Sequence, residues 1–105
     1  MTHARKEVWK FPLKEKGGQW LALPAIANFL CLEYQNGSPT LWYLVDPLSA
    51  EQRIFLRVYG TGQPIHHDGP LTYLGTAFNN DKSFCWHVFR DEGVVENGKP
   101  KLVAG

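Results

Sequence analysis

The chain has 105 residues, a length typical of a single domain, which at this size buries roughly two-thirds of the surface that its unfolded form exposes. Eleven Lys and Arg against ten Asp and Glu give a formal net charge of +1, which makes nucleic acid an unlikely partner because nucleic-acid-binding domains usually carry a basic stripe. The N-terminal MTHARKEVWKF lacks the apolar core of a signal peptide, and no apolar run reaches the roughly 20 residues of a membrane span. We therefore expect a cytoplasmic protein with no membrane partner.

Alternation of apolar and polar residues with a period of two, interrupted by turn residues, predicts an all-β domain of about seven antiparallel strands. We expect a compact sandwich or a partly open barrel over residues 1–90, followed by a flexible C-terminal tail over residues 91–105. In chain order the predicted strands are Glu7–Leu13, Trp20–Leu23, Ala27–Tyr34, Thr40–Asp46, Arg53–Tyr59, Leu71–Phe78 and Ser83–Phe89.

Local signals fix several ends of these strands. Pro24 ends the second strand because proline has no N–H for a ladder. The Asn36-Gly37 pair between apolar runs is a strong hairpin signal. Asp46 before Pro47 indicates a turn, with a short helical turn after it as an alternative. A second hairpin is expected around Asn79-Asn80-Asp81-Lys82.

Two predicted strands are apolar on both faces. Every residue of Leu41–Val45 is apolar, and Phe84–Phe89 interrupts its apolar run only with His87. A strand with one face in solvent should alternate apolar and polar residues, so we expect both faces of these two strands to be buried. A loop, the tail or a second subunit could bury the outer face, and we expect a homodimer.

The segment Tyr59–Pro70 (YGTGQPIHHDGP) is the main candidate for a functional site, because long Gly- and Pro-rich loops are often functional. The structural alternative is a crossover between strands, in which Gly60 and Gly62 supply unusual backbone angles and Pro64 stiffens the path. As a site, backbone N–H groups of this loop would form a nest for an anion or a nucleotide-like ligand. The predicted ligand-binding residues are Arg57, Tyr59, Gly60, Thr61, Gly62, His66 and Trp86.

A metal site of His66, Asp68 and His87 is an alternative, since imidazole and carboxylate suit zinc, manganese or iron. Neighbouring side chains of an extended chain point in opposite directions, so His66 and His67 would rarely share an ion. We predict no metal, no cofactor and no catalytic residue. Cys31 and Cys85 are expected to be reduced, buried thiols, with a bridge between them left open.

Several segments resemble a family of small phage and prophage proteins: WYLVDP at Trp42–Pro47, RVYGTGQPI at Arg57–Ile65, YLGT at Tyr73–Thr76 and WHVF at Trp86–Phe89. The likeness covers about residues 5–90 and implies a viral protein that acts in the host cytoplasm. It brings no known activity, so it implies no catalytic residues.

The sequence favours a non-enzymatic, phage-encoded binding module that engages a host protein or a small molecule and modulates host defence or metabolism. This interpretation rests on the small size of the chain, its density of aromatic residues and the lack of catalytic motifs in its sequence. Three alternatives remain: sequestration of a nucleotide-like ligand by an oligomer, a metal-dependent hydrolase and a minor structural protein of the virion.

Overall fold

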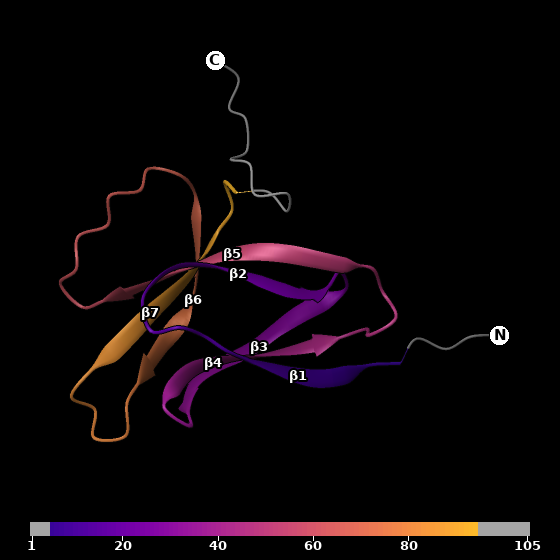
Figure 1. Cartoon of the computed structure of the whole chain (residues 1–105), viewed down its shortest axis with the longest axis horizontal. Helices are drawn as coiled ribbons and strands as arrows, with labels where there is room; N and C mark the ends of the chain where they lie inside the picture. The colour runs from indigo at the N-terminus through magenta and orange to yellow at the C-terminus, as the bar shows by residue number, and fades with distance from the viewer. Residues whose placement is uncertain (1–4, 95–105) are drawn as a thin grey trace, which may run out of the picture.

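The computed structural model describes residues 5–94, which form seven antiparallel strands and no helix (Figure 1). The all-β prediction is confirmed, and every strand end lies within three residues of its predicted position. The strands are β1 (Glu7–Pro12), β2 (Gly17–Pro24), β3 (Ala27–Gln35), β4 (Ser38–Val45), β5 (Glu51–Gly60), β6 (Leu71–Phe78) and β7 (Cys85–Asp91).

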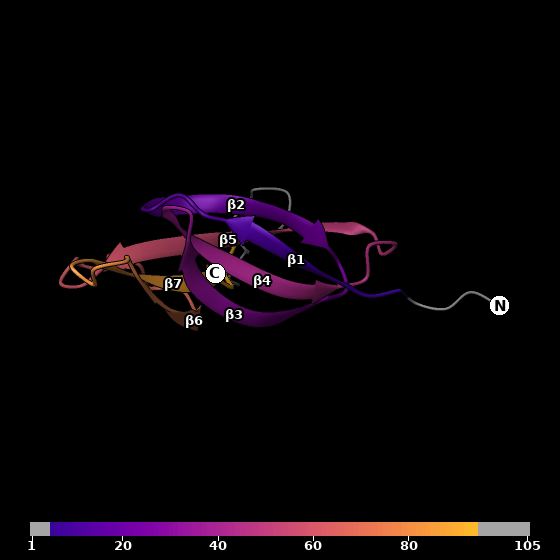
Figure 2. The same cartoon turned by 90° about the horizontal axis from the view of Figure 1, so that it is seen from below.

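The strands build two sheets that pack as a sandwich and do not close into a barrel. One sheet has three strands in the order β1-β4-β3, and the other has four in the order β2-β5-β7-β6. The edge strands β3 and β6 lie side by side (Figures 1 and 2). Gly75 of β6 sits there at φ +152°, and a Cβ on it would lie 3.4 Å from Leu32 of β3. A side chain at this position would contact Leu32, and the backbone angle would strain it.

The core lies between the sheets and follows the period of two. On β4 the odd-numbered residues from Leu41 to Val45 are buried, and on β5 the even-numbered residues from Ile54 to Val58 are buried. Leu56 and Val88 are fully buried, and complete burial of such a side chain contributes about 1.5–3 kcal/mol. This alternation leaves one outer face on each sheet, and the two outer faces differ in chemistry.

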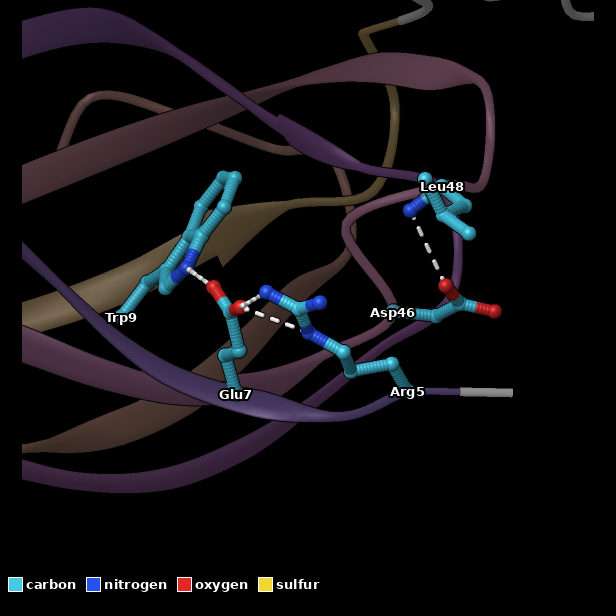
Figure 3. Close-up of polar contacts among 5 residues, drawn as sticks. All are labelled: Arg5, Glu7, Trp9, Asp46 and Leu48. Carbon is cyan, nitrogen blue, oxygen red and sulfur yellow. Dashed lines mark hydrogen bonds and ion pairs between the residues drawn. The ribbon is translucent and has the colours of Figure 1, made fainter. Parts of the chain in front are cut away.

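The turns after β3 and β4 lie at the residues predicted for them. Asn36 and Gly37 have φ values of 50° and 83°, as a two-residue type I′ hairpin requires. Asp46 also acts as a turn residue, because the backbone N–H of Leu48 donates to its Oδ1 at 3.0 Å (Figure 3). The alternative of a helical turn after Pro47 is wrong, since residues 47–48 form a turn closed by the bond from Ser49 N to Asp46 O at 3.1 Å and no helix follows.

The start of β1 is held by a cluster on its inward side (Figure 3). The Glu7 carboxylate accepts hydrogen bonds from Trp9 Nε1 at 2.8 Å and from Arg5 Nη2 at 3.1 Å. The bond from Trp9, followed by that from Arg5, holds the pKa of Glu7 below its ordinary value. Trp9 packs against the core, so this cluster fixes an aromatic side chain at the end of the sandwich.

The C-terminal boundary differs from the expectation. Asp91, where we expected a tail to begin, is the last residue of β7 and is buried. Residues 95–105, which make up most of the expected tail, lie outside the described residues. Within residues 5–94 no helix is long and apolar enough to cross a membrane.

Candidate binding site

Residues 61–70 cross the four-stranded sheet instead of making a hairpin. Both β5 and β6 pair antiparallel with β7, so they run parallel, and the chain must return along the sheet between them. Figure 1 shows this segment as the long loop at the left of the view. The interpretation as a crossover is confirmed. Of the two glycines expected to take unusual angles, Gly62 has a positive φ of 85° and Gly60 does not.

A buried carboxylate fastens this crossover to the sheet. The side chain of Asp91 is fully buried and accepts a hydrogen bond from Arg57 Nε at 2.7 Å. His67 Nε2 of the crossover lies 3.3 Å from the same oxygen, and the backbone N–H of Gly93 donates to the other oxygen at 2.9 Å. Burial acts to raise the pKa of Asp91, but the hydrogen bond from Arg57, with Gly93 and His67, outweighs it and lowers the pKa. Arg57 is thus committed to a structural ion pair.

A groove of about 430 Å³ opens at the end of the sandwich where β5 ends and β7 begins. We call it the end groove. Its volume lies within the range of small-molecule and peptide sites. The residues that line it are Glu15, Gly60, Thr61, Gln63, Phe78, Lys82, Ser83, Phe84, Cys85 and Trp86.

Two phenylalanines stand exposed on the hairpin that borders this groove. Phe78 is 50% exposed and Phe84 is 67% exposed. The turn between them is closely hydrogen-bonded: Asn79 N donates to Phe84 O at 3.1 Å, and Phe84 N donates to Asn79 Oδ1 at 3.0 Å. Asp81 accepts from the hydroxyl and the backbone N–H of Ser83, and these bonds lower its pKa. These bonds therefore hold the backbone that carries the two exposed rings.

The wall of the groove continues into a polar cluster on the outer face of the four-stranded sheet. We call it the His87 cluster, and it consists of Thr61, Tyr73, Thr76, Cys85 and His87. Both ring nitrogens of His87 are engaged: Nε2 lies 2.7 Å from Thr61 Oγ1, and Nδ1 lies 2.8 Å from Thr76 Oγ1. Cys85 Sγ lies 3.6 Å from Nε2. A nucleophile and a base are thus adjacent at the groove.

The structure brings only some of the predicted ligand-binding residues together. Gly60, Thr61 and Trp86 line the end groove, whereas Arg57, Tyr59, Gly62 and His66 are not among its lining residues. His66 is exposed on the crossover.

Two details alter the predicted ligand site. Tyr59 pairs with His87 on the outer face, so Trp86 points to the other side and stacks on Tyr34 at 5.5 Å between ring centroids. The Gly60 N–H donates to Gln63 Oε1 at 2.9 Å, which engages part of the expected anion nest.

Neither the metal alternative nor the buried pair of cysteines is found. Within residues 5–94 no group of three or more His, Cys, Asp or Glu side chains is arranged to hold a metal ion. His87 instead bonds to two threonines. Both cysteines are free thiols, as predicted, but Cys31 is exposed and Cys85 is partly exposed, so the expectation of burial is wrong.

Sequence reasoning missed the two exposed phenylalanines and the pairing of Cys85 with His87. A signal existed for each. The six positions from Asn79 to Phe84 form a polar turn with an aromatic residue at its end. Residues two apart on a strand share a face, which places Cys85 and His87 together. Thr61 and Thr76 lie beside Cys85 and His87 only because of the way in which β5, β6 and β7 pair, which the local sequence does not indicate.

The three-stranded sheet presents a different outer surface, which we call the apolar face. It comprises Val8, Leu30, Trp42 and Leu44, and the register places the exposed Asn28 and Cys31 of β3 opposite Leu44 and Trp42. Val8 is 58% exposed and Leu30 is 48% exposed, and Leu44 is the register partner of Val8 across β1 and β4. Lys10 and Glu33 lie at its border. An apolar centre with charged residues around it is typical of protein interfaces.

A family model described as a domain of unknown function (DUF7352) matches residues 4–98. No curated protein and no solved structure matches the chain.

Proposed function

The chain belongs to the DUF7352 family, and we propose that it is a non-enzymatic binding module that engages a protein partner at the end groove. The observation that carries this proposal is the pair of exposed rings, Phe78 and Phe84, beside a groove of about 430 Å³. Aromatic side chains are enriched at protein interfaces, where they act as anchors in pockets of the partner.

Preorganisation supports this function. Binding costs free energy when side chains and loops become ordered, about 0.5–1.5 kcal/mol for each immobilised side chain. The hydrogen bonds from Asn79 and Asp81 already fix the backbone on both sides of the turn. Lys82 and Glu15 at the groove add charges of both signs, which favour a partner with a mixed polar rim.

We further propose a setting for this module. The likeness of Trp42–Pro47 and Arg57–Ile65 to small phage and prophage proteins supports a phage-encoded protein acting in the host cytoplasm. Its partner would be a host protein of a defence system or of metabolism. The absence of a metal cluster from residues 5–94 is compatible with this role and does not test it.

Site-specific photo-cross-linking in a bacterial host tests the proposal. Benzoylphenylalanine replaces Phe84 in one protein and Leu48, which is 76% exposed in the loop between β4 and β5, in a matched control. We expect a discrete cross-linked host protein from position 84 and none from position 48. The additional change Phe78→Ala should remove the product. Equal products from both positions, or none from position 84, would contradict the proposal.

The same groove is large enough for a small molecule, so a nucleotide-like ligand is the second candidate. Isothermal titration against a panel of nucleotides distinguishes the two. Heat with one nucleotide that disappears in Trp86→Ala would favour the small ligand, because Trp86 is the aromatic residue of the groove that the sandwich itself holds in place. No heat with any member would leave the protein partner as the function.

We also propose that a second copy covers the apolar face to form a homodimer. Val8 and Leu44 give this surface an apolar centre, and burial of apolar area is the main drive for association. Sedimentation velocity of Leu44→Lys should show a monomer at concentrations where the unmodified chain is a dimer. Thr72→Lys, on an exposed position of β6, is the control and should stay dimeric. A monomeric unmodified chain at high concentration would overturn the homodimer.

A further inference from the structure

The His87 cluster places a thiol beside a base. Cys85 and His87 lie two residues apart on β7, so their side chains share the outer face. The sulfur is 3.6 Å from Nε2 of the imidazole, and Thr61 Oγ1 lies 3.1 Å from the sulfur and 2.7 Å from the same nitrogen. The thiol proton can reach the imidazole directly or through the Thr61 hydroxyl.

A third group orients the base. His87 Nδ1 lies 2.8 Å from Thr76 Oγ1, which is itself hydrogen-bonded to the Tyr73 hydroxyl. When Nδ1–H donates to Thr76 and the Thr76 hydroxyl donates to Tyr73, Nε2 is left with its lone pair directed toward Thr61 and Cys85. A nucleophile, a base and an orienting group within hydrogen-bonding reach are the arrangement of an activated nucleophile.

The thiol is accessible to small molecules, because Cys85 lines the end groove. From this geometry we propose that Cys85 is a reactive thiol that exchanges with low-molecular-weight disulfides, with His87 as the base that takes its proton. This modification site lies in the same groove as the protein partner proposed above, but the reaction does not require that partner. It needs no metal and no further reactant, because the disulfide itself is the oxidant.

The exchange balances in three steps. His87 Nε2 accepts the proton of the Cys85 thiol, directly or through Thr61. The thiolate sulfur then attacks one sulfur of the disulfide R–S–S–R, and a Cys85–S–S–R bond forms as the original S–S bond breaks. The second half leaves as the thiolate R–S⁻ and takes the proton from the imidazolium of His87. Cys85 is oxidised to the mixed disulfide, and the leaving sulfur is reduced to a thiol.

The test uses the full-length Cys31→Ser protein, in which Cys85 is the remaining thiol. Dithiodipyridine, a neutral disulfide, reports the reaction through the absorbance of the released thiopyridone in a stopped-flow instrument. We expect Cys85 to react faster in the folded protein than in the same chain unfolded in urea. Folding slows a thiol that is merely half-buried, so an equal or slower rate in the folded protein would overturn the proposal.

Substitutions then assign the roles. His87→Gln should slow the reaction of Cys85 about tenfold or more, a smaller effect than the roughly 10²–10⁴-fold of general acid–base catalysis in enzymes. Thr76→Val should slow it less because the base remains. In the Cys85→Ser protein, where Cys31 is the thiol, His87→Gln should leave the rate unchanged. Circular dichroism shows whether each variant is folded. Cys85 reacting equally fast without the imidazole would refute the role of His87.

Oxidised glutathione identifies the product. Mass spectrometry of the unmodified protein after limited exposure should find one glutathione, located by peptide mapping on Cys85 before Cys31, although Cys31 is the more exposed thiol. Modification of Cys31 first would contradict the proposal, because simple exposure would then govern the reaction.

Discussion

The two sheets share one core but carry opposite outer faces. On the outer face of the four-stranded sheet, polar groups bond to one another, from Asp91 and Arg57 to His87 and its threonines, and His67 of the crossover lies against Asp91. On the three-stranded sheet, Val8 and Leu30 stand about half exposed without such bonds, beside Trp42 and Leu44. Apart from the exposed rings at the end groove, the polar side chains of the first face find partners within the chain, whereas the second face has the composition of a surface that a partner completes.

This difference predicts where a substitution acts. A change on the outer face of the four-stranded sheet breaks bonds that form on folding, so it should lower the free energy of unfolding. A change on the apolar face removes area that only association would bury, so it should weaken the proposed dimer and leave the stability of the monomer nearly unchanged. Substitutions on the two faces should therefore distinguish effects on the free energy of unfolding from effects on association.

The largest effect is expected at Asp91. Replacing it with Ala removes the acceptor for Arg57 and Gly93 and leaves a partly buried guanidinium without its partner. Breaking a buried ion pair by removing one member costs about 3–5 kcal/mol, and we expect about 3 kcal/mol because Arg57 retains some exposure. Urea denaturation at neutral pH measures the change.

Two variants serve as controls for this substitution. Asp91→Asn keeps an acceptor oxygen for Arg57 and should lose less stability than Asp91→Ala. Asp68→Ala removes an exposed carboxylate from the same crossover and should stay within about 0.5 kcal/mol of the unmodified protein. Equal losses at Asp68 and Asp91 would show that charge on the crossover, and not the buried pair, determines stability.

The acid dependence of stability follows from the same carboxylate. Its pKa in the folded state lies below the ordinary value of 3.8, so the unfolded chain binds the proton more readily. The stability from Asp91 is complete above the unfolded value and is lost as the pH falls through 3.8 toward the folded pKa. Arg57 and His67 face this carboxylate.

Urea midpoints measured from pH 7 down to acid show this loss. In Asp91→Asn the decline should be shallower, since the amide does not titrate. The lowered pKa values of Glu7 and Asp81 act equally in both proteins and cancel in the comparison. Parallel curves for the two proteins would mean that Asp91 does not contribute to acid unfolding.

The contrast between the two faces also explains which structural features could be predicted from the sequence. Strand positions were predictable because they depend on local alternation and on turns such as Asn36-Gly37, whose positive φ values follow from the residues themselves. The ion pair of Arg57 with Asp91 spans 34 positions and depends on the register between strands that are not neighbours in the chain. The same register decides that His87, and not Trp86, lies opposite Tyr59.

A smaller effect is expected within the His87 cluster. Thr76→Val keeps the shape of the side chain but removes the hydroxyl between His87 and Tyr73. The loss of a hydrogen bond costs about 1 kcal/mol, which urea denaturation resolves. Thr72→Val, at an exposed position of the same strand, is the comparison: it removes the solvent-exposed hydrogen bond from the Thr72 hydroxyl to Glu92 Oε2 at 2.7 Å and should cost less than the loss of the partly buried bond at Thr76. A loss at Thr72 as large as that at Thr76 would remove the special role of the cluster in stability.

The smallest effect on folding is expected on the apolar face. Val8→Thr replaces one methyl group by a hydroxyl on a side chain that is 58% exposed, so the free energy of unfolding of the monomer should change by no more than about 0.5 kcal/mol. The same change should weaken self-association, because a buried hydroxyl without a partner opposes binding. Denaturation in dilute protein and sedimentation equilibrium in concentrated protein measure the two quantities separately. A large loss of monomer stability with unchanged association would show that this face belongs to the fold of the single chain, and the distinction between the two sheets would fail.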